Sequence, residues 1–254
     1  MLTRRCCVVG GGLWLLDIPG AMASGTRHNA IYGCTLTAHE TSNILGASSD
    51  TRRYVTGDEP MIPQSGDKDF DLALAQTLAK ISDCLNVSPG FAYYDDYDGP
   101  NAFASSQRRL SGADGTVLFG QRFLKQLRAA PENPEVAVAG VCAHEFGHIL
   151  QYKLGLDKQL RDGQPTVKRV ELNADFFAGY FAGVRKRELP AFPAAVVAMT
   201  QYSSGDDMLN NPEHHGTPDE RAQAIVKGYQ TAYVDQMSFL DAIKIGVEYV
   251  MSRF

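Results

Sequence analysis

VAVAGVCAHEFGHILQYKL, residues 136–154, is the stretch of sequence that decides the fold. It contains an H-E-x-x-H pattern, formed by His144, Glu145 and His148, within an otherwise apolar run. Side chains four positions apart on a helix project from one face, so His144 and His148 can hold one Zn²⁺ between them. Glu145 is then placed to take a proton from a metal-bound water.

Signals at both ends of this stretch favour a helix. Asn133 is expected to act as the N-cap, Pro134 suits the first helical position, and Gly155 offers a C-terminal stop. The alternative is that the H-E-x-x-H pattern arises by chance on a solvated helix. The apolar neighbours argue against it, because they would bury three polar side chains without a metal to satisfy them.

A later helix, predicted over residues 167–188, carries a second polar pair. Glu171 and Asp175, in the run ELNAD, are four positions apart and share a face. The chain after His148 is long enough to finish one helix, turn through residues 155–166 and return antiparallel. We therefore expect Glu171 to complete a metal site of two histidines and one glutamate.

Asp175 is expected to support that site from outside the ligand set. It can accept a hydrogen bond from the far nitrogen of a liganding histidine, which fixes the tautomer of the ring. The alternative is that Glu171 and Asp175 form ordinary surface pairs with Lys168 or Arg169. The apolar and aromatic residues around Asp175 leave little exposed face for such pairs.

The composition is that of an ordinary soluble protein with one substantial core. The chain has 254 residues, of which 44% are hydrophobic and 21% charged. A formal net charge of -5 argues against nucleic acid or an acidic lipid as a partner held by charge. Beyond the N-terminus no apolar run approaches the roughly 20 residues that span a bilayer, so we expect no integral membrane span.

Residues 1–23 are expected to be an export signal. Arg4-Arg5 precede a short apolar stretch, and Ala21-Met22-Ala23 offers a cleavage site. The segment resembles a bacterial twin-arginine signal, from which Asp17 and the cysteines after the arginines depart. The expectation is a periplasmic or secreted protein, and the alternative is a disordered or docked tail of a cytoplasmic one.

The rest of the chain divides into two parts. Residues 24–66 are rich in turn formers and contain one alternating run, residues 30–37, that predicts a strand. Residues 67–254 are expected to form the catalytic domain. Cys34 and Cys84 could pair in an oxidising compartment, although the sequence does not fix their distance.

The predicted fold class is α+β, mostly helical with a small mixed sheet beside the H-E-x-x-H helix. Besides the two helices above, the patterns predict strands at 91–94, 101–105 and 116–119 and helices at 67–85, 121–129, 191–202, 218–228 and 234–252. Thr217 and Glu220 predict a capping box at the start of one of them. The acidic cluster at 95–98 is read as a solvated turn in preference to a calcium site.

Together, the H-E-x-x-H and E-x-x-A-D patterns resemble those of the gluzincins, zinc metallopeptidases with a glutamate as third ligand. The longer forms AHEFGHILQ and ELNADFFAG are similar to bacterial neutral zinc metallopeptidases, and the segment of Asn101 and Phe103, NAFA, to M48-type peptidases. The resemblance covers about residues 91–183. It implies a zincin-like fold in which the strand of Asn101 and Phe103 borders the cleft and pairs with an extended peptide substrate.

The run HGTPDER, residues 215–221, extends the similarity to neutral metallopeptidases. It implies that His215 donates a hydrogen bond to the developing oxyanion and that Arg221 holds that loop or the substrate. The alternative is that His214 and His215 are loop histidines beside a helix start.

The function expected from these residues is that of a zinc metalloendopeptidase. One Zn²⁺ is held by His144, His148 and Glu171, and Glu145 acts as general base on the metal-bound water. One rival is a non-catalytic zincin-like chaperone or interaction module of the cell envelope, against which the intact Glu145 argues. The other is an amidase acting on non-protein amide bonds, which only substrate profiling separates.

Overall fold

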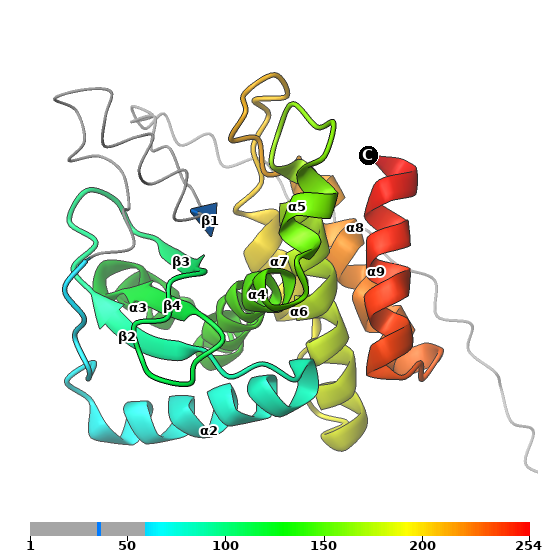
Figure 1. The fold of residues 1–254 in the computed structure, drawn as a ribbon. Coiled ribbons are helices and arrows are strands. Elements are labelled where there is room, and N and C mark those ends of the chain that lie inside the picture. Colours follow the sequence, from blue (N-terminus) through cyan, green and yellow to red (C-terminus); the bar gives the residue numbers. More distant parts are fainter. Residues whose placement is uncertain (1–34, 37–58) are drawn as a thin grey trace, which may run out of the picture. The chain divides into compact units, whose positions relative to one another are not determined.

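A small mixed sheet and a larger set of helices make up the described part of the chain, residues 35–36 and 59–254 of a computed structural model (Figure 1). The expected α+β class, mostly helical with the sheet beside the H-E-x-x-H helix, is confirmed. The described residues belong to one unit by their contacts. The expected export signal, residues 1–23, lies outside the described residues.

The elements follow one another from a strand-containing first half to an all-helical second half. In chain order they are β1 (Thr35–Leu36), α2 (Lys68–Leu85), β2 (Gly90–Tyr94), β3 (Ala102–Ser105), β4 (Thr116–Gly120), α3 (Gln121–Arg128), α4 (Pro134–Leu154), α5 (Leu156–Arg161), α6 (Lys168–Glu188), α7 (Ala195–Tyr202), α8 (Pro218–Tyr229), the π-helix η2 (Gln230–Val234) and α9 (Phe239–Arg253).

The strands lie in the order β1-β3-β4-β2. β4 pairs antiparallel with β3 and parallel with β2, and β1 pairs parallel with β3 through Thr35 and Ala104. Ile62 forms an isolated bridge to Tyr93 on β2, which ties the segment before α2 to the sheet. The strand predicted at residues 30–37 is therefore described only at 35–36, and its remaining residues lie outside the described part.

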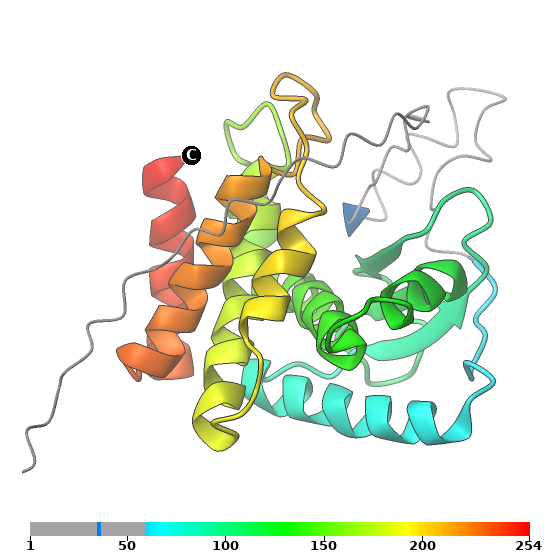
Figure 2. The ribbon, with the colours of Figure 1, turned by 180° about the vertical axis from the view of Figure 1, so that it is seen from behind.

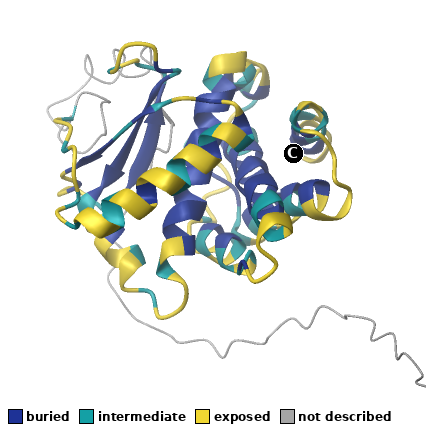
Figure 3. Ribbon diagram, turned by 90° about the horizontal axis from the view of Figure 1, so that it is seen from below, coloured by how far each residue is buried: buried dark blue, intermediate teal, exposed yellow. Residues whose placement is uncertain are grey.

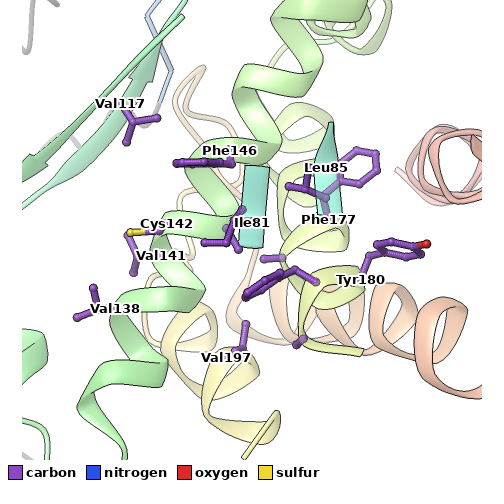
Figure 4. Packing of buried hydrophobic residues seen from close by; sticks show 14 of the residues in the cluster. Ile81, Leu85, Val117, Val138, Val141, Cys142, Phe146, Phe177, Tyr180 and Val197 are labelled. Carbon is purple, nitrogen blue, oxygen red and sulfur yellow. The ribbon is translucent and has the colours of Figure 1, made fainter. Parts of the chain in front are cut away.

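Helix α4 lies between the sheet and α6 (Figure 1), and the colouring of Figure 3 shows that the interior of the described fold is buried. Every residue from Val136 to Gln151 is buried, as expected for a helix that is apolar all round. Figure 4 shows Phe146 of α4 among side chains of α2, α6, α7 and β4. Figure 2 shows α8 and α9 beside α6 on its side away from the sheet. The central part of α4, which carries the H-E-x-x-H residues, is therefore enclosed by packed neighbours.

Glycines bring three of the helices unusually close. A Cβ at Gly147 would lie 3.0 Å from the Cα of Ala174, so α4 and α6 meet there with almost no side chain between them. A Cβ at Gly179 would overlap the carbonyl of Ile225 on α8. In the same way, a Cβ at Gly228 would overlap a carbonyl of α6. The spacing of α4, α6 and α8 is set by backbone contact and leaves little freedom to the side chains that they present.

Several boundaries differ from the sequence-based predictions. Residues 155–166, expected to be a turn, contain the short helix α5. The last helix begins at Phe239 and not at 234, because α8 continues into η2 and Ser238 then caps α9. Asn133 has a left-handed backbone, φ 47°, and its side chain makes no capping bond within the described chain. Gly155 ends α4 in the left-handed conformation, as predicted.

Other local predictions hold. Thr217 and Glu220 form the expected capping box at α8. Cys84 and Cys142 are free cysteines, and Cys34, the proposed partner of Cys84, lies outside the described residues. Within the part of the chain that the structure describes, no helix has the length and hydropathy needed to cross a bilayer.

Candidate metal centre

Helices α4 and α6 bring three ligand groups together at their point of closest packing. His144 Nε2 lies 3.3 Å from Glu171 Oε2, and His148 Nε2 lies 3.5 Å from Glu171 Oε1. The two Nε2 atoms are 3.0 Å apart, and one ligand atom from each residue lies within 4.8 Å of the others. This buried group could bind a metal ion. The ligand set expected from the sequence is therefore assembled by the fold.

The chemistry of the group fits a cation. Both carboxylate oxygens of Glu171 are buried, and neither finds a hydrogen-bond partner among the described residues. Burial acts to raise the pKa of Glu171, but the neighbouring His148 and His215 outweigh it, so that pKa lies well below its usual value. A buried, ionised carboxylate beside two imidazole nitrogens is costly unless a positive ion is shared among them.

His144 is held from behind by a buried charge pair. Its Nδ1 lies 2.7 Å from Asp175 Oδ1, so Nδ1 donates its proton and Nε2 is left to face the metal position. Arg221 donates to both oxygens of Asp175, from Nε at 2.8 Å and from Nη2 at 3.0 Å. Asp175 thus lies where the sequence analysis expects it.

His148 is held by a neutral amide in place of a charge. Its Nδ1 donates to Gln151 Oε1 over 2.9 Å, while Gln151 Nε2 donates to Val170 O and to Asn173 Oδ1. The sequence analysis missed Gln151 and Asn173. The signal for Gln151 was available, since a residue three positions after His148 lies on the same helical face.

Glu145 is the next residue after the first ligand and is almost completely buried, at 1% exposure. Its Oε2 has no hydrogen-bond partner in the described chain. Burial raises the pKa of Glu145 to about 8, with nearby His144 opposing and Glu171 adding to the rise. The backbone N–H of Ala104 on β3 donates to this carboxylate, so β3 and the motif helix meet at Glu145.

His215 and Arg221, the other two residues expected at the site, are both buried. His215 is buried, its Nε2 has no hydrogen-bond partner within the described ranges, and it contributes to the lowered pKa of Glu171. Arg221 is 1% exposed and donates from Nη1 to Ser204 O. Of the two roles expected for Arg221, its contacts fit holding the loop, and its burial leaves no surface for a substrate.

The residues expected to support a substrate from β3 are placed differently. Phe103 is fully buried and packs edge-to-face on Tyr94, so its side chain belongs to the core, and a contact of this strand with substrate stays a prediction. Asn101 is also buried, and its backbone N–H donates to Asp96. Asp96 itself is not solvated as expected: it is buried and accepts from the first turn of α3 at Arg122 N. Asp96 therefore caps α3, whereas Asp95 and Asp98 are exposed, as expected of a solvated turn.

No protein-family model, no curated protein and no solved structure matches this chain. Its function is therefore argued from the geometry of the centre.

Proposed function

We propose that this chain is a zinc metalloendopeptidase of the gluzincin kind with a zincin-like fold. The observation that carries the proposal is the buried group of His144, His148 and Glu171 with the carboxylate of Glu145 beside it. Two histidines and one carboxylate are the ligands of catalytic zinc, which keeps a further position for water or substrate. A purely structural zinc would not need a second buried carboxylate, that of Glu145, beside its ligands.

Each side chain has a part in this reaction. Asp175 and Gln151 keep the rings of His144 and His148 with Nε2 toward the metal position. Zinc bound there supplies Lewis acidity, polarising the scissile carbonyl and acidifying a water. Glu145 takes the proton of that water and passes it to the leaving amine, a task suited by a pKa near 8 before metal binding.

His215 completes the set as the donor to the developing oxyanion. Its buried Nε2 and its electrostatic interaction with Glu171 support a position facing the centre. The proposed substrate is an extended peptide beside β3, whose Ala104 binds Glu145. β1 pairs with the outer edge of β3 at Ala104 and Ser105, so a substrate would compete with residues 35–36 for it. A periplasmic or secreted location completes the proposal.

The test is zinc-dependent hydrolysis of an unstructured protein, casein, by the full chain. Glu145→Gln should bind zinc and lose turnover by about 10² to 10⁴, the usual contribution of a general base. His148→Ala should lose both zinc and turnover. Zinc content is measured on the same samples, so that loss of the base is separated from loss of the metal.

Two results would overturn the proposal. Turnover that survives in Glu145→Gln would remove the assigned base. Tight zinc binding without hydrolysis of casein or of shorter peptides would favour the non-catalytic interaction module, and hydrolysis confined to non-protein amides would favour the amidase.

A further inference from the structure

Helix α4 carries a tyrosine hydroxyl that the proposed chemistry does not use. Tyr152 comes four positions after His148 and seven after Glu145, so its side chain projects from the same face of the helix as theirs. Side chains on a helix lean toward its N-terminus, which directs the phenol back toward Glu145. Its hydroxyl donates to Ala104 O on β3 over 3.4 Å. Tyr152 therefore reaches from the motif helix to the sheet.

The backbone of Ala104 faces away from β4, on the edge where β1 pairs. Ala104 lies opposite Val117 in the antiparallel pair of β3 and β4. At the start of the same register, Gly120 N donates to Asn101 O at 2.8 Å. Hydrogen-bonded and non-hydrogen-bonded pairs alternate along such a ladder, so the pair three positions further on is a non-hydrogen-bonded one. The N–H and the C=O of Ala104 therefore lie on the outer edge of β3.

Two side chains of α4 bind these two backbone groups. The N–H of Ala104 donates to the carboxylate of Glu145, and its C=O accepts from the hydroxyl of Tyr152. β1 also pairs with β3 at Ala104, and a carbonyl oxygen has two lone pairs with which it can accept from both. One helix face thus supplies both an acceptor and a donor to a single residue of the sheet.

These hydrogen bonds give the contact between α4 and β3 its direction. The two elements also contribute apolar side chains to the same core, among them Ile149 and the methyl group of Ala104. Apolar packing is non-directional, whereas a hydrogen bond restricts both the distance and the angle of its partners. Burial raises the pKa of Tyr152 well above its usual value, with Arg161 opposing the rise and Glu145 adding to it, so the hydroxyl stays a donor.

We propose that Tyr152 is a positioning residue for the general base: by binding Ala104 O it holds β3 against α4, so that Ala104 N–H keeps the Glu145 carboxylate oriented. This inference rests on the proposed function, in which Glu145 is that base. The alternative is that the phenol ring only fills space, since Tyr152 also packs against the hydrophobic core. Tyr152→Phe separates the two roles, because it removes the hydroxyl and keeps the ring.

The first test is casein hydrolysis by the zinc-loaded full chain. A misplacement of 1 Å can cost about 10² in rate, and 3.4 Å is long for a hydroxyl donor, so Tyr152→Phe should lower kcat by about 10-fold. KM and zinc content should stay within about twofold, because neither a ligand nor the edge of β3 is removed. The matched control is Tyr180→Phe, whose hydroxyl also donates to a backbone carbonyl, Met237 O at 3.0 Å. It should leave kcat within about twofold.

Amide NMR of the zinc-loaded chain, labelled with ¹⁵N-alanine, tests the positioning without a substrate. The Ala104 signal is the one that Ala104→Gly removes. Glu145→Gln should move the Ala104 amide proton upfield, because it replaces a charged acceptor by a neutral one. Tyr152→Phe should move the same signal in the same direction, and Tyr180→Phe should leave it in place.

An Ala104 signal that Tyr152→Phe does not move would overturn the proposal and leave the proposed function standing. A loss of kcat that Tyr180→Phe shares, or that comes with loss of zinc, would replace the positioning role by a structural one. In the wild type, which needs no variant to fold, the ring protons of Tyr152 should show a nuclear Overhauser effect to backbone protons at Ala104, and its absence contradicts the proposal. Casein left uncleaved by the wild type counts against the proposed function alone, because the amide shifts report the contact without turnover.

Discussion

The two histidines on α4 that could bind a metal ion are supported by opposite chemistries. His144 donates to the charged Asp175, which is itself held by the buried Arg221, whereas His148 donates to the neutral amide of Gln151. The charged support joins α4, α6 and α8, and the amide support joins only α4 and α6. Loss of the support should therefore destabilise the protein more at His144 than at His148. Breaking the charge pair leaves a buried charge without a partner, and breaking the amide contact does not.

The largest effect should come from Asp175→Ala. This substitution leaves the guanidinium of Arg221 buried without its carboxylate, so the free energy of unfolding should fall by about 3–5 kcal/mol. Metal affinity should fall about 10- to 100-fold, as for loss of a supporting carboxylate. Urea unfolding and a zinc titration measure the two effects. The control is Asp175→Ala combined with Arg221→Met, which removes the stranded charge and should recover part of the stability.

At the amide support of His148, Gln151→Met should lower the free energy of unfolding by less than Asp175→Ala does. It removes the acceptor for His148 Nδ1 and the donor to Val170 O, and the expected loss is about 1–3 kcal/mol of unfolding free energy. The same urea and zinc measurements apply. A loss equal to that of Asp175→Ala would show that charge does not distinguish the two supports.

The decrease in unfolding free energy at low pH should also distinguish the charged support of His144 from the amide support of His148. Burial acts to raise the pKa of Asp175, but Arg221 and His144 outweigh it and the pKa is lowered. A lowered carboxyl pKa gives stability that is present above the unfolded pKa and is lost as pH falls through the folded one. In the metal-free chain, the unfolding free energy of Asp175→Asn should therefore fall less steeply with decreasing pH than that of the wild type. The two slopes should differ by at most about 1.4 kcal/mol per pH unit.

Gln151→Met is the comparison for that experiment, because an amide does not titrate. Its urea midpoint between pH 2 and pH 6 should fall in parallel with that of the wild type, since Glu171, whose pKa is also lowered, remains in both. If the urea midpoint of Gln151→Met also changed less with pH than that of the wild type, the loss of stability in acid would have a cause other than Asp175.

The smallest expected difference in stability is between the residues that bind Arg221 and Gln151 and do not touch the histidines. Gln201 accepts from the charged Arg221 at 2.9 Å, and Asn173 accepts from the neutral Gln151 at 3.0 Å. Gln201→Ala should cost about 1.5–3 kcal/mol and Asn173→Ala about 0.5–1.5 kcal/mol, the usual ranges for charged and neutral partners. Equal losses in urea unfolding would limit the difference between the supports to the residues that touch the histidines.

The sequence was informative where spacing along one helix fixes geometry. His144, His148 and Glu171 could be assigned because the four-residue step and one antiparallel return determine which faces meet. Gln201 could not, because it reaches Arg221 from a separate helix whose approach depends on tertiary packing. The burial of the Phe103 side chain was likewise not evident from the motif, because it depends on how β3 packs in the fold.

Boundary errors have local causes as well. Residues 155–166 were predicted to be a turn, but they contain the helix α5, whose Leu160 is fully buried. A helix of six residues is too short to show a clear apolar periodicity in the sequence. The expected start of the last helix at 234 was wrong because a π-helical turn interrupts the apolar periodicity there.

The glycine contacts between α6 and α8 have a consequence for how this protein fluctuates. At Gly179 and Gly228 each backbone lies directly on the other, so the two helices cannot separate slightly without losing dispersion contacts along the whole seam. Small openings of the native state then belong to less tightly joined segments, and amide hydrogens along the seam should exchange with solvent only in the rarest, largest openings. We therefore expect the support of His144 to lie in the slowest-exchanging part of the described fold.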